Sequence, residues 1–316
     1  MTSVIFMGTP QFAVPVLQGL VDNNYDVKAV VTQPDRPVGR KHKIMASPVK
    51  QLATQLNIPV LQPEKISGSD ELQQMIDIAP DFIITAAFGQ FLPTKLLNAA
   101  KIAAVNVHGS LLPKYRGGAP VQYALMNGDE ETGITIMYMV KKMDAGDILA
   151  QQSLPIQNDD DVESLFNKLS FIGRDLLLAT LPRVMDGSIE PKPQVEAEVV
   201  FSPNIQPGEE QLDFTKPAKL VDAKVRALRP NPGAFTILNG KRTKIWQTEV
   251  INETTNLLPG MVVKKAKHDL FIAAGDQTII ALKKLQPAGK PKQDITQFLN
   301  GSGQKITEGQ QVITNE

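Results

Sequence analysis

Short apolar runs alternate with amphipathic segments over the first 110 residues of the chain. The runs have the length of buried strands and cover residues 4–7, 27–31, 58–61, 82–86 and 103–107. Helix start signals stand between them, because Ser47-Pro48 precedes residues 49–56 and Ser69-Asp70 precedes residues 72–78. This alternation predicts an α/β fold with a Rossmann-like, doubly wound and mostly parallel sheet.

The pattern continues with two more strands and a long helix. Residues 133–140 and 148–154 have the composition of strands, and the polar segment 141–147 joins them. The acidic residues 159–161 then precede an apolar stripe that ends near Gly187. Because carboxylates favour the N-terminus of a helix, this predicts a long helix and a first domain that spans residues 1–189.

Residues 190–208 are rich in proline and polar side chains, as interdomain linkers are. The remaining chain, residues 209–316, begins with an expected short helix over residues 217–228. Short strands follow at residues 235–238, 244–250, 260–264, 270–273 and 278–285. Several short strands with frequent turns predict a small C-terminal β-barrel domain of the OB-like kind.

Charge is balanced over the whole chain but not between its two parts. The chain has 33 basic and 33 acidic residues; residues 1–204 carry 17 Lys+Arg and 22 Asp+Glu, and residues 205–316 carry 16 and 11. The net charges are therefore −5 and +5. A basic domain beside an acidic one can attract a polyanion. Chance variation of the surface explains the asymmetry equally well.

The chain contains no cysteine, which excludes disulfides, thiolate nucleophiles and cysteine-ligated metal sites. The first residues form a strand-like run and lack the basic and apolar regions of a signal peptide. No apolar run approaches the roughly 20 residues that a membrane helix needs. We therefore expect a cytoplasmic protein that does not bind a membrane, with a monomer as the default state.

The strongest candidates for chemistry stand at the end of the fifth predicted strand. Of the three histidines, at positions 42, 108 and 268, only His108 ends a predicted buried strand among polar groups. Asn106 faces the same side, since side chains alternate along a strand. A lone histidine is more often a structural side chain. An amide beside an imidazole nevertheless suits acyl transfer, which needs an oxyanion donor and a group that exchanges protons near neutral pH.

Two nearby residues need separate interpretation. Ser110 shares the strand parity of His108, but Gly109 and the following Leu-Leu-Pro favour a turn, so we do not expect a serine nucleophile. Asp144 lies in the segment between the sixth and seventh predicted strands, from which a carboxylate can reach His108 and stabilise the imidazolium. Asp144 could also be a simple turn residue, and Asp147 competes for the same role.

The turn after the first strand, Gly8-Thr9-Pro10, lacks the G-x-G-x-x-G fingerprint of dinucleotide-binding proteins. No acidic residue at the expected distance completes a ribose site. We therefore expect neither NAD nor a bound metal ion.

Two longer motifs contain these candidate residues. The segment Asn106-Val-His-Gly-Ser-Leu-Leu-Pro-Lys-Tyr-Arg-Gly-Gly-Ala-Pro120 resembles the signature of the formyltetrahydrofolate-dependent formyltransferases, and Met143-Asp-Ala-Gly-Asp-Ile148 resembles their second motif. Residues 6–12 and 225–235 are similar to the branch of that family that acts on methionyl-tRNA, so the resemblance covers both predicted domains.

The resemblance implies a function and a set of site residues. The catalytic residues would be Asn106, His108 and Asp144. The co-substrate 10-formyltetrahydrofolate would bind at Ser110, Leu111, Leu112, Pro113, Phe88 and Gln90. The initiator methionyl-tRNA would accept the formyl group for translation initiation. The loop 32–44 would approach the tRNA acceptor end, with contacts from Arg36, Arg40, Lys41 and Lys43. The second domain would bind tRNA as well, with contacts from Lys219 and Arg226.

The basic composition of loop 32–44 suits phosphates, although a basic run is more often a solvated surface. A loop of this length without secondary structure is usually functional or disordered.

Three alternatives stay open from the sequence. A formyltransferase of the same fold could act on a small amine, such as a nucleotide sugar or glycinamide ribonucleotide. A related folate hydrolase would use the same three residues but normally carries further domains. A non-catalytic RNA-binding protein would explain the basic second half, but it would leave Asn106, His108 and Asp144 without a role.

Overall fold

The computed structural model describes residues 1–38 and 43–314, and the chain divides into two compact units. Unit 1 comprises Met1–Pro120, Glu131–Pro155 and Leu165–Pro203, and unit 2 comprises Val121–Glu130, Ile156–Ser164 and Asn204–Glu316. The predicted linker 190–208 is thus divided. Its residues up to 203 belong to unit 1, because their backbone and side chains bond to that unit. Proline-rich composition alone did not show this.

Unit 1 is built on a seven-stranded sheet with the order β5-β2-β1-β6-β7-β8-β9. The first five strands in that order are parallel, and β8 and β9 are antiparallel to their neighbours. This confirms the mostly parallel sheet. The strands are β1 (Ser3–Gly8), β2 (Asp26–Val31), β5 (Val60–Leu61), β6 (Phe82–Ala86), β7 (Ala103–His108), β8 (Glu131–Tyr138) and β9 (Ile148–Pro155).

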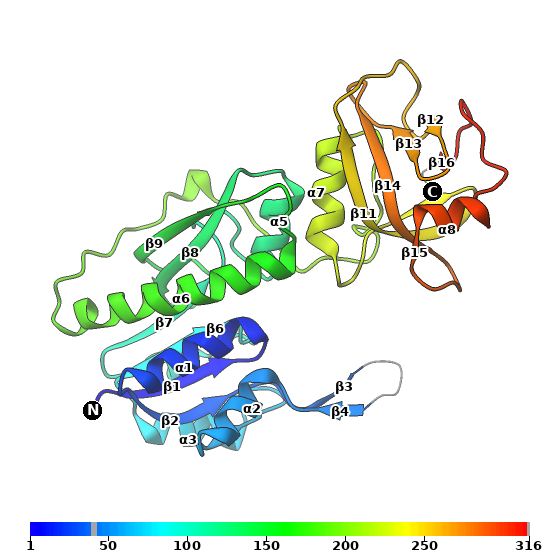
Figure 1. Ribbon diagram of the computed structural model, residues 1–316. Helices are drawn as coiled ribbons and strands as arrows, with labels where there is room; N and C mark the ends of the chain where they lie inside the picture. The colour runs from blue at the N-terminus through cyan, green and yellow to red at the C-terminus, as the bar shows by residue number, and fades with distance from the viewer. Residues whose placement is uncertain (39–42, 315–316) are drawn as a thin grey trace. The chain divides into compact units, whose positions relative to one another are not determined.

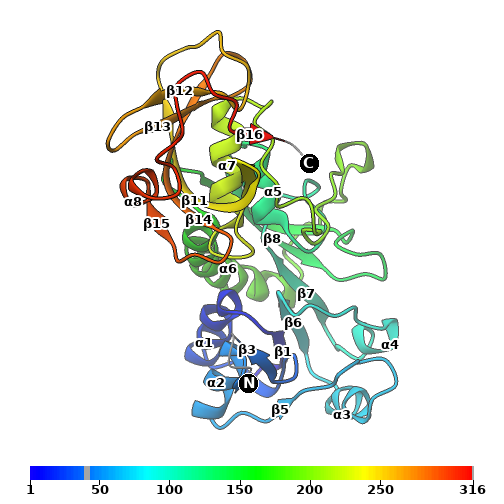
Figure 2. The same cartoon turned by 90° about the vertical axis from the view of Figure 1, so that its right-hand side faces the viewer.

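Helices cover both faces of this sheet, so that β1 and β6 lie between α1 on one side and α3 and α4 on the other (Figure 2). The helices of the first 190 residues are α1 (Val14–Asp22), α2 (Pro48–Gln55), α3 (Asp70–Ile78), α4 (Thr94–Leu97), α5 (Pro120–Met126) and α6 (Val162–Met185). Ser47 and Ser69 accept hydrogen bonds from the first turns of α2 and α3, as their sequence signals predict.

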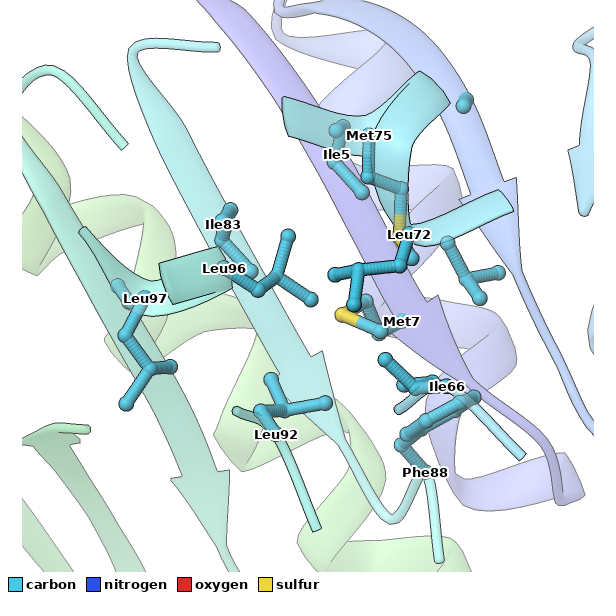
Figure 3. Close-up of a cluster of buried hydrophobic side chains, with 13 residues drawn as sticks. Ile5, Met7, Ile66, Leu72, Met75, Ile83, Phe88, Leu92, Leu96 and Leu97 are labelled. Atoms are coloured by element: carbon cyan, nitrogen blue, oxygen red, sulfur yellow. The ribbon is translucent and has the colours of Figure 1, made fainter. Parts of the chain in front are cut away.

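One face of the sheet packs against α3 and α4 (Figure 3). Ile5 and Met7 of β1 and Ile83 of β6 alternate with residues of the opposite face, and they contact Leu72 and Leu96 in one buried cluster. Period-two alternation therefore fixes which strand residues meet these helices. The cluster holds the carboxyl ends of the parallel strands in place.

The other face packs closely against α6. A Cβ on Gly173 would lie 2.8 Å from Val107 Cγ1, and a Cβ on Gly19 of α1 would lie 2.5 Å from Arg174 Cγ. The Phe12 and Phe166 rings meet edge to face at 5.9 Å. Glycines at these two contacts allow α1, α6 and the sheet to approach one another. No helix in the described part of the chain is long and apolar enough to cross a membrane.

Unit 2 contains an antiparallel sheet with the order β12-β13-β14-β11-β10-β16, and β15 pairs with β14 (Figure 1). The backbone of Gly260 and Val262, at the start of β12, bonds to residues 310–313 beside β16, so the two edges of the sheet meet. This closure agrees with the predicted barrel. The elements are α7 (Ala218–Leu228), β10 (Phe235–Leu238), β11 (Lys241–Ile251), β12 (Val262–Lys265), β13 (Leu270–Ala273), β14 (Ile279–Pro287), β15 (Gln293–Asp294), α8 (Ile295–Asn300) and β16 (Ile313–Thr314).

The basic loop 32–44 differs from its prediction. It contains a two-stranded hairpin of β3 (Arg36–Val38) and β4 (Lys43–Met45), where a structureless loop was expected. The backbone pairing of Pro37 with Ile44 lies at the centre of this hairpin, and it satisfies main-chain groups of both strands. Residues 39–42, which include Arg40 and Lys41, lie outside the described residues.

Candidate active site

The carboxyl end of β7 presents Asn106 and His108 on the same side of the sheet. Strand β7 lies between β6, to which it is parallel, and β8, to which it is antiparallel. It is therefore the outermost of the parallel strands on that side of the sheet. Ligands of open α/β sheets bind at such ends. His108 is buried, with 6% of its side chain exposed, and Asn106 is half-buried.

Asn106 is oriented by a hydroxyl from the neighbouring strand. Thr85 pairs with Asn106 in the β6–β7 register, and its Oγ1 donates a hydrogen bond of 2.7 Å to Asn106 Oδ1. Because the amide oxygen is thereby engaged, Nδ2 remains as the donating end of the side chain. A fixed amide donor of this kind can stabilise a developing oxyanion.

Both ring nitrogens of His108 have neighbours. Nε2 lies 2.9 Å from the Tyr115 carbonyl oxygen, and since a carbonyl only accepts, Nε2 carries a proton. The Ser202 hydroxyl donates to the same carbonyl at 3.0 Å. Nδ1 lies 3.8 Å from Asp144 Oδ1. The ring is thus fixed at one edge, and its other nitrogen faces a carboxylate.

Asp144 is held in a left-handed backbone conformation, with φ of 49°. Its Oδ2 accepts a hydrogen bond of 2.9 Å from the Gly117 amide, and its Oδ1 faces His108. A separation of 3.8 Å exceeds hydrogen-bond distance, so Asp144 acts on His108 through its charge and not through a direct hydrogen bond. The structure thus places Asp144, one of the two predicted candidates, beside the histidine.

The loop after β7 is fixed by side chains of β8 and β9. Thr135 Oγ1 donates to the Ser110 carbonyl at 2.7 Å and accepts from the Leu112 amide at 3.1 Å. Gln151 Nε2 donates to the Leu112 carbonyl at 2.8 Å. The Ser110 hydroxyl is buried and donates to the Lys114 carbonyl at 2.7 Å. The Ser110 hydroxyl is thus engaged with the main chain of its own loop.

The six residues expected to bind the folate have different surroundings. Phe88 and Leu112 are buried, and Phe88 belongs to the core cluster of Figure 3. The Gln90 amide is engaged with the main chain of residues 63, 64 and 66. Leu111 and Pro113 are half-buried. Contact of these six residues with the folate stays a prediction.

The residues expected to contact tRNA fall into two groups. Lys43 and Lys219 are exposed, and Arg36 is exposed beside Glu64. Arg226 is different, because within unit 2 its guanidinium donates to Asp222 Oδ2 and to the Asp160 carbonyl, both at 2.7 Å. This pairing leaves only 12% of its side chain exposed.

The sequence did not point to several residues that support the site. Arg116 lies in the first motif, and its side chain is fully buried. Its Nε donates to Gln194 Oε1 at 2.9 Å, and its terminal nitrogens donate to Glu196. The Lys142 ammonium, and then the Arg116 guanidinium, hold the pKa of Glu196 below its ordinary value. Two signals in the sequence could have indicated these residues. One is the arginine at position 116 inside the first motif, and the other is the hydroxyl of Thr85 inside an apolar strand, because buried polar groups need partners.

Comparison with known proteins identifies the family. The family model described as formyl transferase matches residues 1–181, and the one described as formyl transferase, C-terminal domain, matches residues 204–303. A protein of Lactiplantibacillus plantarum named methionyl-tRNA formyltransferase is 62% identical over 315 residues, which are 99% of each chain. A protein of the same name from Levilactobacillus brevis is 62% identical over 312 residues, again 99% of each chain.

Solved structures share the fold at low sequence identity. An N-formyltransferase from Helicobacter canadensis, in complex with folinic acid and dTDP-3-aminofucose, has a TM-score of 0.67 and 20% identity, covering 91% of this chain and 100% of that one. HypX from Aquifex aeolicus, in complex with tetrahydrofolic acid, has a TM-score of 0.64 and 17% identity. This chain covers 50% of that longer protein.

Proposed function

The chain belongs to the formyl transferase family, and we propose that it transfers the formyl group of 10-formyltetrahydrofolate to the amino group of initiator methionyl-tRNA. The observation that carries the proposal is the 62% identity, over 99% of both chains, to a protein named methionyl-tRNA formyltransferase. The arrangement of Asn106, His108 and Asp144 supplies the groups that such a reaction needs. A tRNA acceptor also places the reaction in the cytoplasm.

In the proposed reaction, the methionyl amine attacks the formyl carbon and forms a new C–N bond. The formyl oxygen gains negative charge in the tetrahedral intermediate. The Asn106 amide, oriented by Thr85, and the Nδ1–H of protonated His108 stabilise that charge. The Tyr115 carbonyl accepts from Nε2, which leaves Nδ1 as the ring donor for the substrate.

Two protons must move before the reaction is complete. The amine loses one proton after attack, and Asp144 accepts it directly or through a water molecule. The folate N10 gains one proton as its bond to the formyl carbon breaks, and His108 is placed to supply it. The Asp144 carboxylate lies 3.8 Å from Nδ1, on the side of the ring that donates to the substrate.

Exposed basic residues support the tRNA part of the proposal. Lys43 on β4 and Lys219 on α7 are exposed, and within the described part of the chain no ion pair holds them as Glu64 holds Arg36 and Asp222 holds Arg226. Lysines of this kind suit the phosphate backbone, which positions a nucleic acid without reading its sequence.

A competition for acceptors tests the function. The full chain is incubated with 10-formyltetrahydrofolate and either initiator methionyl-tRNA or a dTDP-amino sugar, and formylated product is measured. We expect product from methionyl-tRNA only, formed on the order of 100- to 1000-fold more slowly by the His108→Ala variant. Formylation of the amino sugar alone would reject the proposal in favour of a small-amine transferase. Tight tRNA binding without any formyl transfer would favour a non-catalytic RNA-binding protein.

A further inference from the structure

Two loops of unit 1 adjoin or contain the catalytic groups, and a third segment joins these loops. The two site loops are residues 109–119, which follow His108, and residues 141–147, which contain Asp144. The bridging segment, residues 194–202, lies in the stretch whose composition predicts a linker. All three belong to unit 1.

Gln194 uses both ends of its side-chain amide to connect the site loops. Its Nε2 donates hydrogen bonds of 2.8 Å to the carbonyls of Asp144 and Gly146. Its Oε1 accepts from Arg116 Nε at 2.9 Å. An amide can do this because it offers two donors and an acceptor, and no other side-chain type of this length does so without charge.

The backbone that Gln194 contacts needs such support. Asp144 has a φ of 49°, a region that non-glycine residues seldom occupy. A Cβ on Gly146 would lie 1.9 Å from the Tyr138 carbonyl oxygen, so the loop turns sharply against β8. Held in this conformation, Asp144 directs Oδ2 to the Gly117 amide and Oδ1 to His108.

The 109–119 loop is held by the same segment. The Arg116 amide donates to the Val200 carbonyl at 2.9 Å, and the Ser202 amide donates to the Arg116 carbonyl at 2.8 Å. The Arg116 side chain is fully buried, so its hydrogen bonds to Gln194 and Glu196 are not replaced by water. The exposed ion pair between Glu196 and Lys142 makes a second connection, but solvent screens it.

We propose that Gln194 is a positioning residue for formyl transfer, which acts by joining the Asp144 loop to Arg116 and so holding the Asp144 carboxylate against Gly117 and His108. The inference rests on the proposed function. It predicts that loss of the amide lowers turnover and leaves substrate binding largely unchanged, because Asp144 acts on the reacting groups and not on the distant parts of either substrate.

Two substitutions distinguish the hydrogen bonds that the Gln194 side chain donates from the one that it accepts. Gln194→Met keeps the length of the side chain and removes every hydrogen bond. Gln194→Glu keeps an oxygen acceptor for Arg116 but removes the donors to the Asp144 and Gly146 carbonyls. We expect kcat to fall on the order of 10- to 100-fold in both, since a displacement of about 1 Å can cost on the order of 100-fold. KM for both substrates should stay within about twofold.

Gln206→Met is the matched control. Gln206 is an exposed glutamine beyond the bridging segment, and its side-chain Nε2 donates to the nearby Asn204 carbonyl. Its kcat and melting temperature should equal those of the unmodified chain. Normal kcat in Gln194→Glu would overturn the proposal, because the donors to the Asp144 loop would then be dispensable.

A double-mutant cycle excludes a merely structural role. In an Asp144→Asn background, Gln194→Met should lower kcat by less than about threefold, because its effect passes through the residue already changed. A full 10- to 100-fold loss in that background would overturn the proposal, since Gln194 would then act by another route, such as general stability.

Amide hydrogen exchange gives a readout that does not depend on activity. We expect faster exchange of the Gly117 amide in Gln194→Met, because that amide loses the fixed Asp144 acceptor, and unchanged exchange in Gln206→Met. Unchanged exchange at Gly117 in both variants would contradict the proposal. If the chain formylates a small amine in place of methionyl-tRNA, the same kinetic ratios are measured with that amine, so the function and the role of Gln194 fail separately.

Discussion

Two of the residues expected to do chemistry and two lysines expected to contact tRNA have opposite surroundings. His108 and Asp144 are buried or nearly so, and each contacts a main-chain group of unit 1. Lys43 and Lys219 are exposed. The difference follows from the two tasks, because a reacting group must be held in one geometry before the substrate arrives, whereas a phosphate contact needs only charge and reach.

Removal of a catalytic group should have the largest effect. Asn106→Ala, His108→Ala and Asp144→Ala each remove a group that stabilises charge or moves a proton. We expect kcat for methionyl-tRNA formylation to fall on the order of 100- to 1000-fold in each, with KM changed far less. Steady-state kinetics with both substrates measures this. Near-normal kcat in all three variants would show that these residues do not take part in the reaction, and the contrast with the exposed lysines would then have no functional meaning.

The orientation of Asn106 should matter less than its presence. Thr85→Val keeps the shape of the side chain and removes the hydrogen bond to Asn106 Oδ1, so the amide is free to turn. We expect kcat to fall about 10-fold, by analogy with partial loss of an oxyanion donor. The measurement is kcat at saturating concentrations of both substrates.

Thr132→Val is the control for that change. Thr132 is a buried threonine on β8 of the same sheet, and among the residues that the structure describes its hydroxyl has no hydrogen-bond partner. Its replacement should leave kcat unchanged and stability equal or slightly higher, because an unsatisfied buried hydroxyl is removed. Equal losses in the two variants would show that Thr85 contributes only to packing.

Much of the fold follows from the sequence because its signals are local. Alternating apolar runs located the strands of the parallel sheet, and Ser47 and Ser69 marked the starts of two helices. The β3–β4 hairpin escaped prediction because its pairing joins two strands of three residues each, too short for an alternation pattern. Loop composition contains no information about such pairing.

The candidate catalytic residues stand out in the sequence, but the residues that hold them in place do not. Asn106 and His108 were found because strand ends and period-two alternation are visible in the sequence. Gln194 was missed because it acts across 50 residues on the Asp144 carbonyl, and its segment has the composition of a linker. The sequence shows side chains near a strand end but not the main-chain groups that a distant amide will meet.

Lys219 and Arg226 provide an internal contrast on α7. Lys219→Ala should raise KM for methionyl-tRNA by a few fold and reduce the salt dependence of binding by about one ion, with kcat unchanged.

Arg226→Ala should mainly lower the melting temperature, because it breaks the bonds to Asp222 and the Asp160 carbonyl. Binding titrations at several salt concentrations and thermal melts distinguish them. If Arg226→Ala raised KM for methionyl-tRNA and left the melting temperature unchanged, Arg226 would contact tRNA after all.

The smallest effect is expected from Glu196, which combines both kinds of surroundings. It is exposed like Lys43 and Lys219, yet it bonds to buried Arg116. Hydrogen bonds from Lys142 and Arg116 lower the pKa of its carboxyl group. A lowered folded-state pKa means that its contribution to stability is full above the unfolded value of about 4.3 and disappears as pH falls through the lower folded value. Glu196→Gln should therefore be less stable than the unmodified chain near neutral pH, and the difference should shrink on acidification and at high salt. Chemical denaturation at a series of pH values measures this, and a difference that grew toward low pH would contradict the assignment of the carboxylate as the interacting form.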